Sequence, residues 1–438
     1  MPILNSLVSV EGIIPTGELD ITENGTQEVA NYATVNVNVP NPSTGELDII
    51  ENGVYNVTNY ASANIQVSGA GGLYREFELD YSGVLQPNYN ATHTMNFSGI
   101  TGISTYVLYR AYPGAPITGN INMSDLVSLN AVNSCYQAFY GCPYITGAYL
   151  NNLTSISATG SARQMFASCT NLTTVNLGSL QTISGNGALG MFAGCTNLTN
   201  LDLSSLETFE GASQNMFTGT NIATINLPSC TTLNGAASMF EYCTNLTSAN
   251  LSSVTYLNGC TRAFGDCTSL TDVNLISVQS LGANGCRQMF EGCTSLETLN
   301  LCNLTTMVAN GLPGVCNGCT NLTSVDLSNL TTIGNYGLQN AFQGCENLTE
   351  LSFPALTTIG NYGLQSAFQG CENLTELSFP ALTTISGTRK DQLSNMCLGI
   401  PDITIHFPAA MQAKVEALTG YSATAPFGAS AGNVIFDL

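Results

Sequence analysis

The stretch "GNYGLQNAFQGCENLTELSFPALTTI" occupies Gly334–Ile359, and the next 26 residues, Gly360–Ile385, repeat it with one change, from Asn340 to Ser366. One unit of this length is too short to bury its own apolar residues, whereas a stacked copy covers them on both sides. The duplication therefore predicts a solenoid in which each 26-residue unit forms one coil.

The same pattern extends well beyond the duplicated pair. A Phe or Met, a Cys three residues later and a Leu three residues after that recur at spacings of 23 to 28 residues. Leucine-rich spacing, as in Leu172-x-x-Val175-x-Leu177, follows each cysteine and predicts a leucine-rich-repeat solenoid. The repeated cysteines are Cys142, Cys169, Cys195, Cys243, Cys267, Cys293, Cys319, Cys345 and Cys371.

Each unit predicts a strand and a short helix. Leu172–Leu177 alternates apolar and polar residues, which is typical of a strand with one buried face. Leu338, Ala341 and Phe342 lie at spacings of three and four, which favours a short helix on the convex side that ends at Gly344. The predicted fold class is an α/β leucine-rich-repeat solenoid with a parallel sheet and short convex helices, preceded by small all-β modules.

The repeated cysteines are predicted to fill one column of the core as buried thiols. Stacked positions about 5 Å apart fit the Cα separation of a disulfide, but parallel Cβ vectors disfavour its dihedral angle. Only Cys316-x-x-Cys319 has the spacing of a metal-binding pair, and His93 and His406 lie far from it in the sequence. We therefore expect neither metal nor cofactor.

The repeats and the C-terminal tail resemble a known family. The segments "MFEGCTSLETLNLCNLTTM" and "AFQGCENLTELSFPALTTIGNYG" closely resemble BspA-like leucine-rich repeats. The tail, "ITIHFPAAMQAKVEALTGYSATAPFGASAGNVIFDL", is similar to that family's usual ending of a strand, a helix and a final strand. The resemblance covers Ile121–Leu438 and implies a curved binding scaffold, which often occurs in surface adhesins of bacteria and mucosal parasites.

A different repeat opens the chain. The modules "TGELDITENGTQEVANYATVNVNV" (Thr16–Val39) and "TGELDIIENGVYNVTNYASANIQV" (Thr44–Val67) each place Asn-Gly between alternating segments. Asn-Gly at this place predicts a β-hairpin, with turns at Asn24-Gly25 and Asn52-Gly53. The modules resemble those near the N-termini of bacteriophage virion proteins, including tail-associated and head-fibre proteins, and this resemblance implies attachment to a virion.

These patterns predict five parts of the chain. They are two tandem β-hairpin modules for attachment or oligomerisation (1–67), a Gly-rich linker (68–72), a β-rich collar or N-terminal cap (73–120), the BspA-like solenoid (121–407) and a C-terminal cap (408–438).

The charge balance excludes several partners. Against 29 Asp and Glu residues stand only 8 Lys and Arg, for a formal net charge of −21. Binding to nucleic acid or to anionic lipid needs a basic surface, so neither is expected. The N-terminal "MPILNSLVSVEG" has no basic region, which argues against a secretory signal peptide. No apolar run reaches the length of a transmembrane helix, so no membrane insertion is expected.

The exposed face of the predicted sheet is the candidate binding surface. We expect its acidic residues to contact a protein or glycan, with an alternative in which a column of Asn and Asp side chains only satisfies itself and water. Acidic residues at repeat-equivalent positions, such as Glu346 and Glu372, and the absence of catalytic motifs predict that the chain is not an enzyme. The candidate ligand-binding residues are Asp202, Asp272, Asp326, Glu350 and Glu376.

Together these features predict a non-enzymatic bacteriophage virion protein, either a tail fibre, a head fibre or a decoration protein. Its N-terminal modules would join it to other virion proteins as a homo-oligomer, and its solenoid would bind a host-surface protein or glycan. It would be assembled in the host cytoplasm and carried on the virion. The alternatives are a bacterial BspA-like adhesin at the cell surface and an intracellular interaction scaffold.

Overall fold

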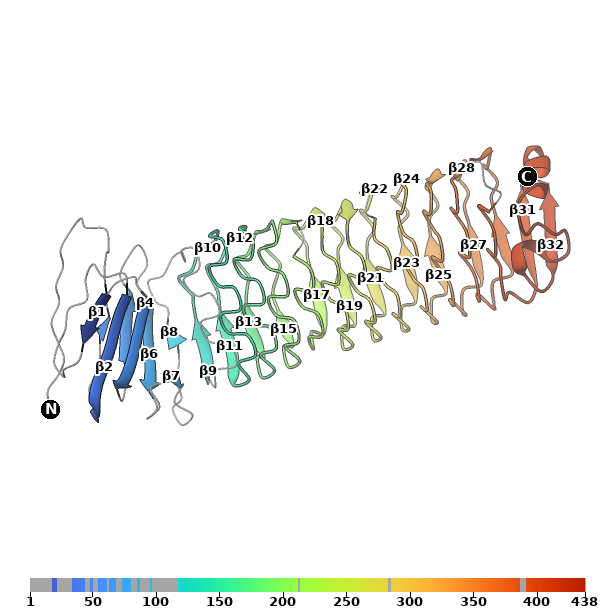
Figure 1. Ribbon diagram of the computed structural model, residues 1–438. Coiled ribbons are helices and arrows are strands. Elements are labelled where there is room, and N and C mark those ends of the chain that lie inside the picture. Colours follow the sequence, from blue (N-terminus) through green and yellow to red (C-terminus); the bar gives the residue numbers. More distant parts are fainter. Residues whose placement is uncertain are drawn as a thin grey trace.

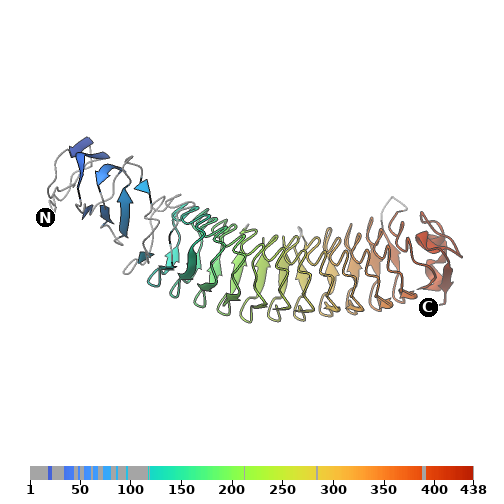
Figure 2. The same ribbon diagram turned by 90° about the horizontal axis from the view of Figure 1, so that it is seen from below.

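The computed structural model describes residue 117, residues 119–211, 213–282, 285–386 and 391–437, and eight strands between residues 18 and 96 without their side chains. The coils from residue 119 onward follow one another along one axis (Figures 1 and 2). They form a parallel β-solenoid of about 12 turns with almost no helix. The solenoid predicted from the repeat is therefore confirmed.

One strand of each coil lies on what we call the odd-strand face. Neighbouring strands on this face run parallel, and Glu350 pairs in register with Glu376. The two copies of the duplicated unit therefore stack position for position. The strands of this face are β9 (Gly119–Asn122), β11 (Ile145–Tyr149), β13 (Thr174–Asn176), β15 (Asn200–Leu201), β17 (Thr224–Asn226), β19 (Ser248–Asn250), β21 (Asp272–Asn274), β23 (Thr298–Asn300), β25 (Ser324–Asp326), β27 (Glu350–Ser352), β29 (Glu376–Ser378) and β31 (Ile403–Phe407). The last strand of the chain, β32 (Gly432–Phe436), pairs with β31 and extends this face.

A second strand of each coil lies on the even-strand face. Thr358 pairs with Thr384 here, so this face repeats the register of the first. The strands are short because only two or three residues per coil are extended. They are β10 (Ser128–Leu129), β12 (Ser155–Ile156), β14 (Thr182–Ile183), β16 (Thr208–Glu210), β18 (Thr232–Asn234), β20 (Tyr256–Asn258), β22 (Ser280–Leu281), β24 (Thr306–Met307), β26 (Thr332–Ile333), β28 (Thr358–Ile359) and β30 (Thr384–Ile385).

The third side of each coil, which we call the turn face, is where the convex helices were expected, and that prediction was wrong. In the duplicated unit the backbone takes a positive φ every fourth residue, at Tyr336, Asn340 and Gly344. The N–H of Phe342 donates to Ala367 of the next coil, and the N–H of Ala341 donates to Leu338 of its own coil. Each coil thus alternates bonds to the next coil with three-residue turns.

This alternation explains why the sequence suggested a helix. Leu338, Ala341 and Phe342 are all fully buried, as an amphipathic helix would require. A turn repeating every four residues also brings positions three and four apart to one side. Gly344 has φ +72, as a helix-ending glycine would, but it ends the last of these turns instead.

The core is a set of columns, each formed by one residue type from successive coils. Buried phenylalanine rings stack from Phe139 to Phe290 with centroids 5.2–5.6 Å apart. Cys316 occupies the next position, and the stack resumes with Phe342 and Phe368 at 5.8 Å. Each ring is covered by its neighbours, so burial of this column depends on stacking of the coils.

After β31 the chain leaves the repeat. It forms the short helices η1 (Ala409–Met411), α1 (Gln412–Glu416) and η2 (Pro426–Gly428), and β32 then pairs in parallel with β31. With five residues, α1 is far shorter than the roughly 20 residues that cross a bilayer, and no described helix is long and apolar enough to do so.

The N-terminal strands contradict part of the hairpin prediction. The strands β3 and β4, which flank Asn52-Gly53, belong to different sheets, and β3 pairs in parallel with β5 just as β1 does with β2. The Asn-Gly turns themselves lie outside the described residues. Two paired strands that run parallel cannot be joined by a tight hairpin turn, because the chain must first cross back to the end at which the first strand began. These strands are β1 (Glu18–Ile21), β2 (Thr34–Ser43), β3 (Asp48–Ile49), β4 (Val54–Tyr60), β5 (Ala63–Val67), β6 (Leu73–Leu79), β7 (Leu85–Gln86) and β8 (Met95–Asn96).

Candidate binding surfaces

The odd-strand face carries two columns of outward side chains along the solenoid. In β27, Leu351 is buried while Glu350 and Ser352 are exposed, and β17, β21 and β23 show the same alternation. The middle residue holds the core, and the residues on either side of it face solvent. All five predicted ligand-binding residues lie on this face, either within one of its strands or directly after one.

Two of the five, Asp202 and Asp326, support the turn that follows their strand. A carboxylate oxygen of Asp202 accepts the N–H of Ser204 at 2.9 Å, and Asp326 accepts that of Ser328 at 3.0 Å. Hydrogen bonds from the hydroxyl and then the N–H of Ser204 lower the pKa of Asp202. The same turn is held by Asn250, Asn274 and Asn300.

Asparagines of this second column also bond to each other. The Asn250 amide donates to Asn226 of the preceding coil at 2.8 Å. The column is therefore a hydrogen-bonded ladder at these positions, as the alternative interpretation of the sequence expected. Asp202 and Asp326 have a structural task here, and their contact with a ligand stays a prediction.

The other three residues, Asp272, Glu350 and Glu376, lie in the first outward column and are exposed. Glu350 and Glu376 are register partners on adjacent strands, and the backbones of two such strands lie about 4.8 Å apart. Like charges in this position repel. The ring of His406, which pairs in register with Ser378 of the second column, lies 3.9 Å from Glu376 and 3.1 Å from Asp437. Asp272 is three coils away, so the five residues do not converge on one point.

The repeated cysteines are buried in the core of the solenoid. Their thiols donate to main-chain carbonyls of the preceding coil, as Cys195 does to Phe166 and Cys371 to Phe342, at 3.1 and 3.0 Å. All sixteen cysteines are described, and none forms a disulfide. Burial raises the pKa of Cys195 and of Cys371 to about 12, so these thiols stay protonated near neutrality. Among the described residues, no group of three or more His, Cys, Asp and Glu side chains is arranged to hold a metal.

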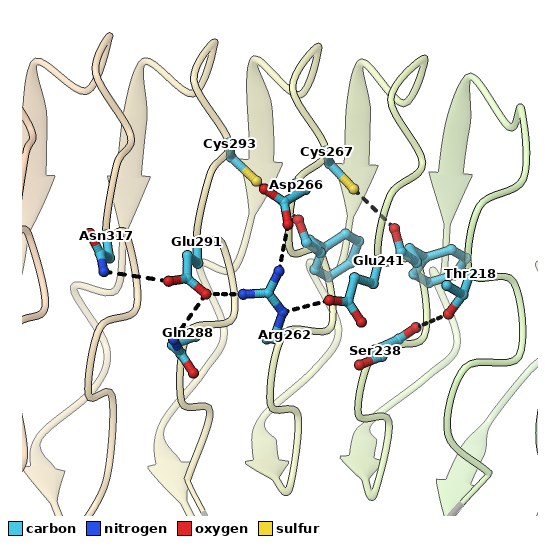
Figure 3. Close-up of polar contacts among 12 residues, drawn as sticks. Thr218, Ser238, Glu241, Arg262, Asp266, Cys267, Gln288, Glu291, Cys293 and Asn317 are labelled. Carbon is cyan, nitrogen blue, oxygen red and sulfur yellow. Dashed lines mark hydrogen bonds and ion pairs between the residues drawn. The ribbon is translucent and has the colours of Figure 1, made fainter.

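The turn face carries an ionic network that the sequence did not indicate. Arg262 lies between three carboxylates, with Glu241 and Asp266 at 2.5 Å and Glu291 on the other side (Figure 3). The side chains of Arg262, Glu241 and Glu291 are 25%, 12% and 22% exposed. In the sequence, Glu241 and Glu291 lie 21 and 29 residues from Arg262. The repeat spacing carried this signal, but only the register of the turn face brings the three residues together.

A polar pocket of about 280 Å³ lies beside this network. Glu291 also accepts hydrogen bonds from Gln288 at 2.9 Å and from Asn317 at 3.4 Å, and both side chains line the pocket. Amide groups and one guanidinium make up most of its wall. The lining residues are Thr261, Arg287, Gln288, Asn310, Pro313, Gly314, Asn317, Gln339 and Asn340.

An aromatic pair follows the pocket on the turn face. The rings of Tyr336 and Tyr362 stack with centroids 4.8 Å apart and an interplanar angle of 11°. Tyr336 occupies in its coil the place that Asn310 occupies in the coil before, since each lies six residues ahead of the position aligned with the phenylalanine column. Tyr336 is 38% exposed, so this pair is partly accessible to solvent.

The family model described as "BspA type Leucine rich repeat region" matches residues 119–189, 162–286 and 263–397, which together cover more than half of the chain. No curated protein matches.

Several solved bacterial structures are similar at low identity. A leucine-rich repeat protein from Bacteroides ovatus is 19% identical, with a TM-score of 0.31, over 80% of this chain and 97% of the other. A leucine rich cell surface protein from Faecalibacterium prausnitzii is 18% identical, with a TM-score of 0.29, over 74% and 95%. The pneumococcal vaccine antigen PcpA is 16% identical, with a TM-score of 0.33, over 86% and 96%. With TM-scores below 0.5, these similarities say nothing about function.

Proposed function

The chain belongs to the BspA-type leucine-rich-repeat family, and we propose on this basis that it is a non-enzymatic protein of a bacterial cell surface that binds a protein or a glycan. The solenoid acts as a rigid scaffold, and the odd-strand face meets the ligand. Asp272, Glu350 and Glu376 are the side chains of this face that we expect to make contact.

One observation supports this proposal above the others, namely the separation of core and surface on the odd-strand face. Leu351 and its equivalents hold the coil, while the exposed residues beside them have no part in the core. A repeat protein built in this way presents an extended surface whose chemistry can change without loss of stability. The exposed carboxylates Glu350 and Glu376 repel each other in the isolated protein, and a partner with basic or hydrogen-bond-donating groups relieves that repulsion.

Absence of enzymatic activity is part of the proposal. A catalytic site is usually a single irregular group of acid, base and nucleophile. The carboxylates of the odd-strand face recur instead at equivalent register positions on successive coils. This regular arrangement favours binding along a surface over chemistry at one point.

The virion interpretation receives no support from the family match, which covers only the solenoid. The N-terminal modules that motivated it lie largely outside the described residues. Attachment through these modules, homo-oligomerisation and the five-part division of the chain therefore remain predictions. The cell-surface alternative is the better supported of the two.

Immunogold labelling with an antibody against the solenoid tests the location. We expect label on the surface of intact producing cells. Label at a fixed place on purified phage particles, with none on cells, would contradict the proposal and restore the virion interpretation.

A pair of matched variants tests the binding face. The ligand is first selected by binding of the labelled full-length chain to arrayed extracellular proteins and glycans. Replacing Glu350 and Glu376 by Ala should reduce that binding at least tenfold. Replacing Glu346 and Glu372 by Ala removes the same charge from the same two coils at exposed positions outside the strands, and should leave binding unchanged. Equal loss in both variants would show a general charge effect and no specific face.

A further inference from the structure

The polar pocket on the turn face arises where one coil departs from the repeat. Successive coils align outward side chains in two adjacent columns just before the phenylalanine position. Arg287 and Gln288 occupy these columns in one coil, and Gln339 and Asn340 occupy them two coils later. The coil between them has "GLPGVC" in place of "GLQNAF", so Pro313 and Gly314 stand where longer side chains are expected.

The backbone does not require glycine at this position. Gly314 has φ +62, but the equivalent Gln288 and Asn340 both have φ +55 and carry side chains. A Cβ on Gly314 would lie 3.1 Å from Cγ of Gln288, a tight contact that a small shift of this half-buried side chain would relieve. The missing side chain is therefore a feature of this coil's sequence, and it leaves a notch between two filled positions of the column.

The notch is lined by groups suited to a polar ligand. Arg287 is exposed, and no ion pair to it occurs within the part of the chain that the structure describes. Gln288 and Asn317 direct their amide nitrogens to Glu291. This orientation leaves their carbonyl oxygens as acceptors for hydroxyl groups. Glu291 is itself paired with Arg262, so its charge is compensated beside the pocket.

We propose that this pocket binds a saccharide residue that carries a single carboxylate. The Arg287 guanidinium pairs with the carboxylate through two parallel hydrogen bonds, a geometry that favours Arg over Lys. The amides of Gln288, Asn317 and Asn340 bond to the ring hydroxyls. The stacked Tyr336–Tyr362 pair offers its face to the adjoining sugar.

Size and charge narrow the ligand further. A volume of about 280 Å³ lies just below the usual range of about 300–1,000 Å³ for small-molecule pockets, which suits one sugar ring. The net charge of −21 opposes a polyanion, so the carboxylate should be isolated, as at the end of a chain. An acidic peptide is less suitable because no apolar side chain apart from Pro313 lines the pocket. The pocket lies on the turn face and is separate from the odd-strand face, so this assignment adds a second binding site beyond the function proposed above.

Calorimetry and saturation-transfer NMR with the full-length chain test the assignment. The probes are two matched pairs, methyl glucuronide with methyl glucoside and sialyllactose with lactose. We expect the carboxylated member of at least one pair to bind at least tenfold more tightly than its neutral partner. Acetyl-Gly-Glu-Gly serves as the peptide probe, and tighter binding of this peptide would overturn the choice of a saccharide.

Three variants locate the effect. Arg287→Gln removes the charge, and Gly314→Asn fills the notch with the residue found in the next coil. Each should weaken binding of the acidic probe at least tenfold. Arg163→Gln is the control, because Arg163 is exposed at the same repeat position and stacks on Tyr136 at 5.5 Å. It should bind as the parent does.

The outcomes separate this assignment from the general function. Equal binding of acidic and neutral probes, full binding by Gly314→Asn, or no binding of any saccharide would overturn the pocket assignment. Circular dichroism confirms that each variant is folded. Surface labelling together with loss of binding in the Glu350 and Glu376 variant would still support the proposed function if the pocket failed.

Discussion

The Cys371 thiol donates a hydrogen bond to the main-chain carbonyl of Phe342 in the preceding coil, with Sγ and O 3.0 Å apart. That carbonyl already accepts the N–H of Cys345, so the thiol supplies its second hydrogen bond. The repeated cysteine thus links adjacent coils without a covalent bond. Thr220, which replaces it in one coil, is also buried, but its hydroxyl donates to the carbonyl of Phe217 in its own coil at 2.9 Å and lies 3.3 Å from Cys243.

Replacing Cys371 by Ala should therefore lower the free energy of unfolding by about 1–2 kcal/mol, through loss of one buried hydrogen bond and a small cavity. Thr at position 371 should be tolerated better than Ala, because Thr220 already fills this site elsewhere. Urea unfolding of the three proteins measures the difference. If the Ala variant were as stable as the parent, the thiol would be only a space-filling group.

Thiol reactivity should single out Cys302. It is the one cysteine of the sixteen that is partly exposed, whereas the others are buried. In the native protein at pH 8, dithionitrobenzoate should react with one thiol, and the Cys302→Ser variant should show none. All sixteen should react in denaturant. Several fast-reacting thiols in the native protein would contradict the packing of the cysteine column.

Stability should fall in alkaline solution. Burial raises the pKa of Cys135, Cys195 and Cys371 from an ordinary value of 9.0 to about 12. Between these values the unfolded chain loses protons that the folded chain keeps, so the unfolded state gains stability as pH rises. The thiol contribution is thus fully present below pH 9 and is lost as pH approaches 12. Thermal unfolding between pH 7 and 11 should show a melting temperature that is constant at first and then declines.

The Arg262 network should contribute to stability more than a surface ion pair does. Arg262→Gln leaves Glu241, Asp266 and Glu291 close together without a cation, and we expect a loss of about 2 kcal/mol. Adding Glu291→Gln to this variant should recover part of the loss. Arg287→Gln, which removes an exposed cation, should change stability by less than about 0.5 kcal/mol. Equal effects of the two arginine variants would indicate that the network is too hydrated to matter.

Asn340→Ala distinguishes the observed turn from the helix that the sequence suggested. Ala stabilises a helix relative to Asn. At φ +55, however, its Cβ is strained, and the variant should lose about 1 kcal/mol. Asn340→Gly should be close to neutral, because glycine adopts a positive φ without strain. Urea unfolding midpoints give the sign of each change, and a gain for Ala would contradict the turn geometry.

The repeat spacing predicted the coils and their parallel register. Each period of the sequence corresponds to one coil, and stacking then places equivalent residues of neighbouring coils side by side. The helix could not be excluded in the same way, since the spacing of Leu338, Ala341 and Phe342 is common to both backbones. What separates the two is the pairing of every second N–H with the next coil, which no single unit contains.

The candidate site was predicted unevenly for a similar reason. The exposed position of Glu350 and Glu376 followed from strand alternation. The capping role of Asp202 needed the turn geometry after the strand, and the Arg262 network needed the register of the turn face. The sequence also carries a direct signal of the pocket, because Pro313-Gly314 stands in one coil where the next coil has Gln339-Asn340.

Hydrogen bonds between coils run along the axis of the solenoid on all three faces. A pull applied between its ends acts on every boundary between coils in series, and a coil at the end of the stack, which has a neighbour on one side only, detaches first. Each detached 26-residue coil replaces a rise of about 4.8 Å by up to about 90 Å of extended chain. Under mechanical load, the molecule is therefore a tether that lengthens in steps and dissipates work at each step, while the coils that remain keep their surface intact.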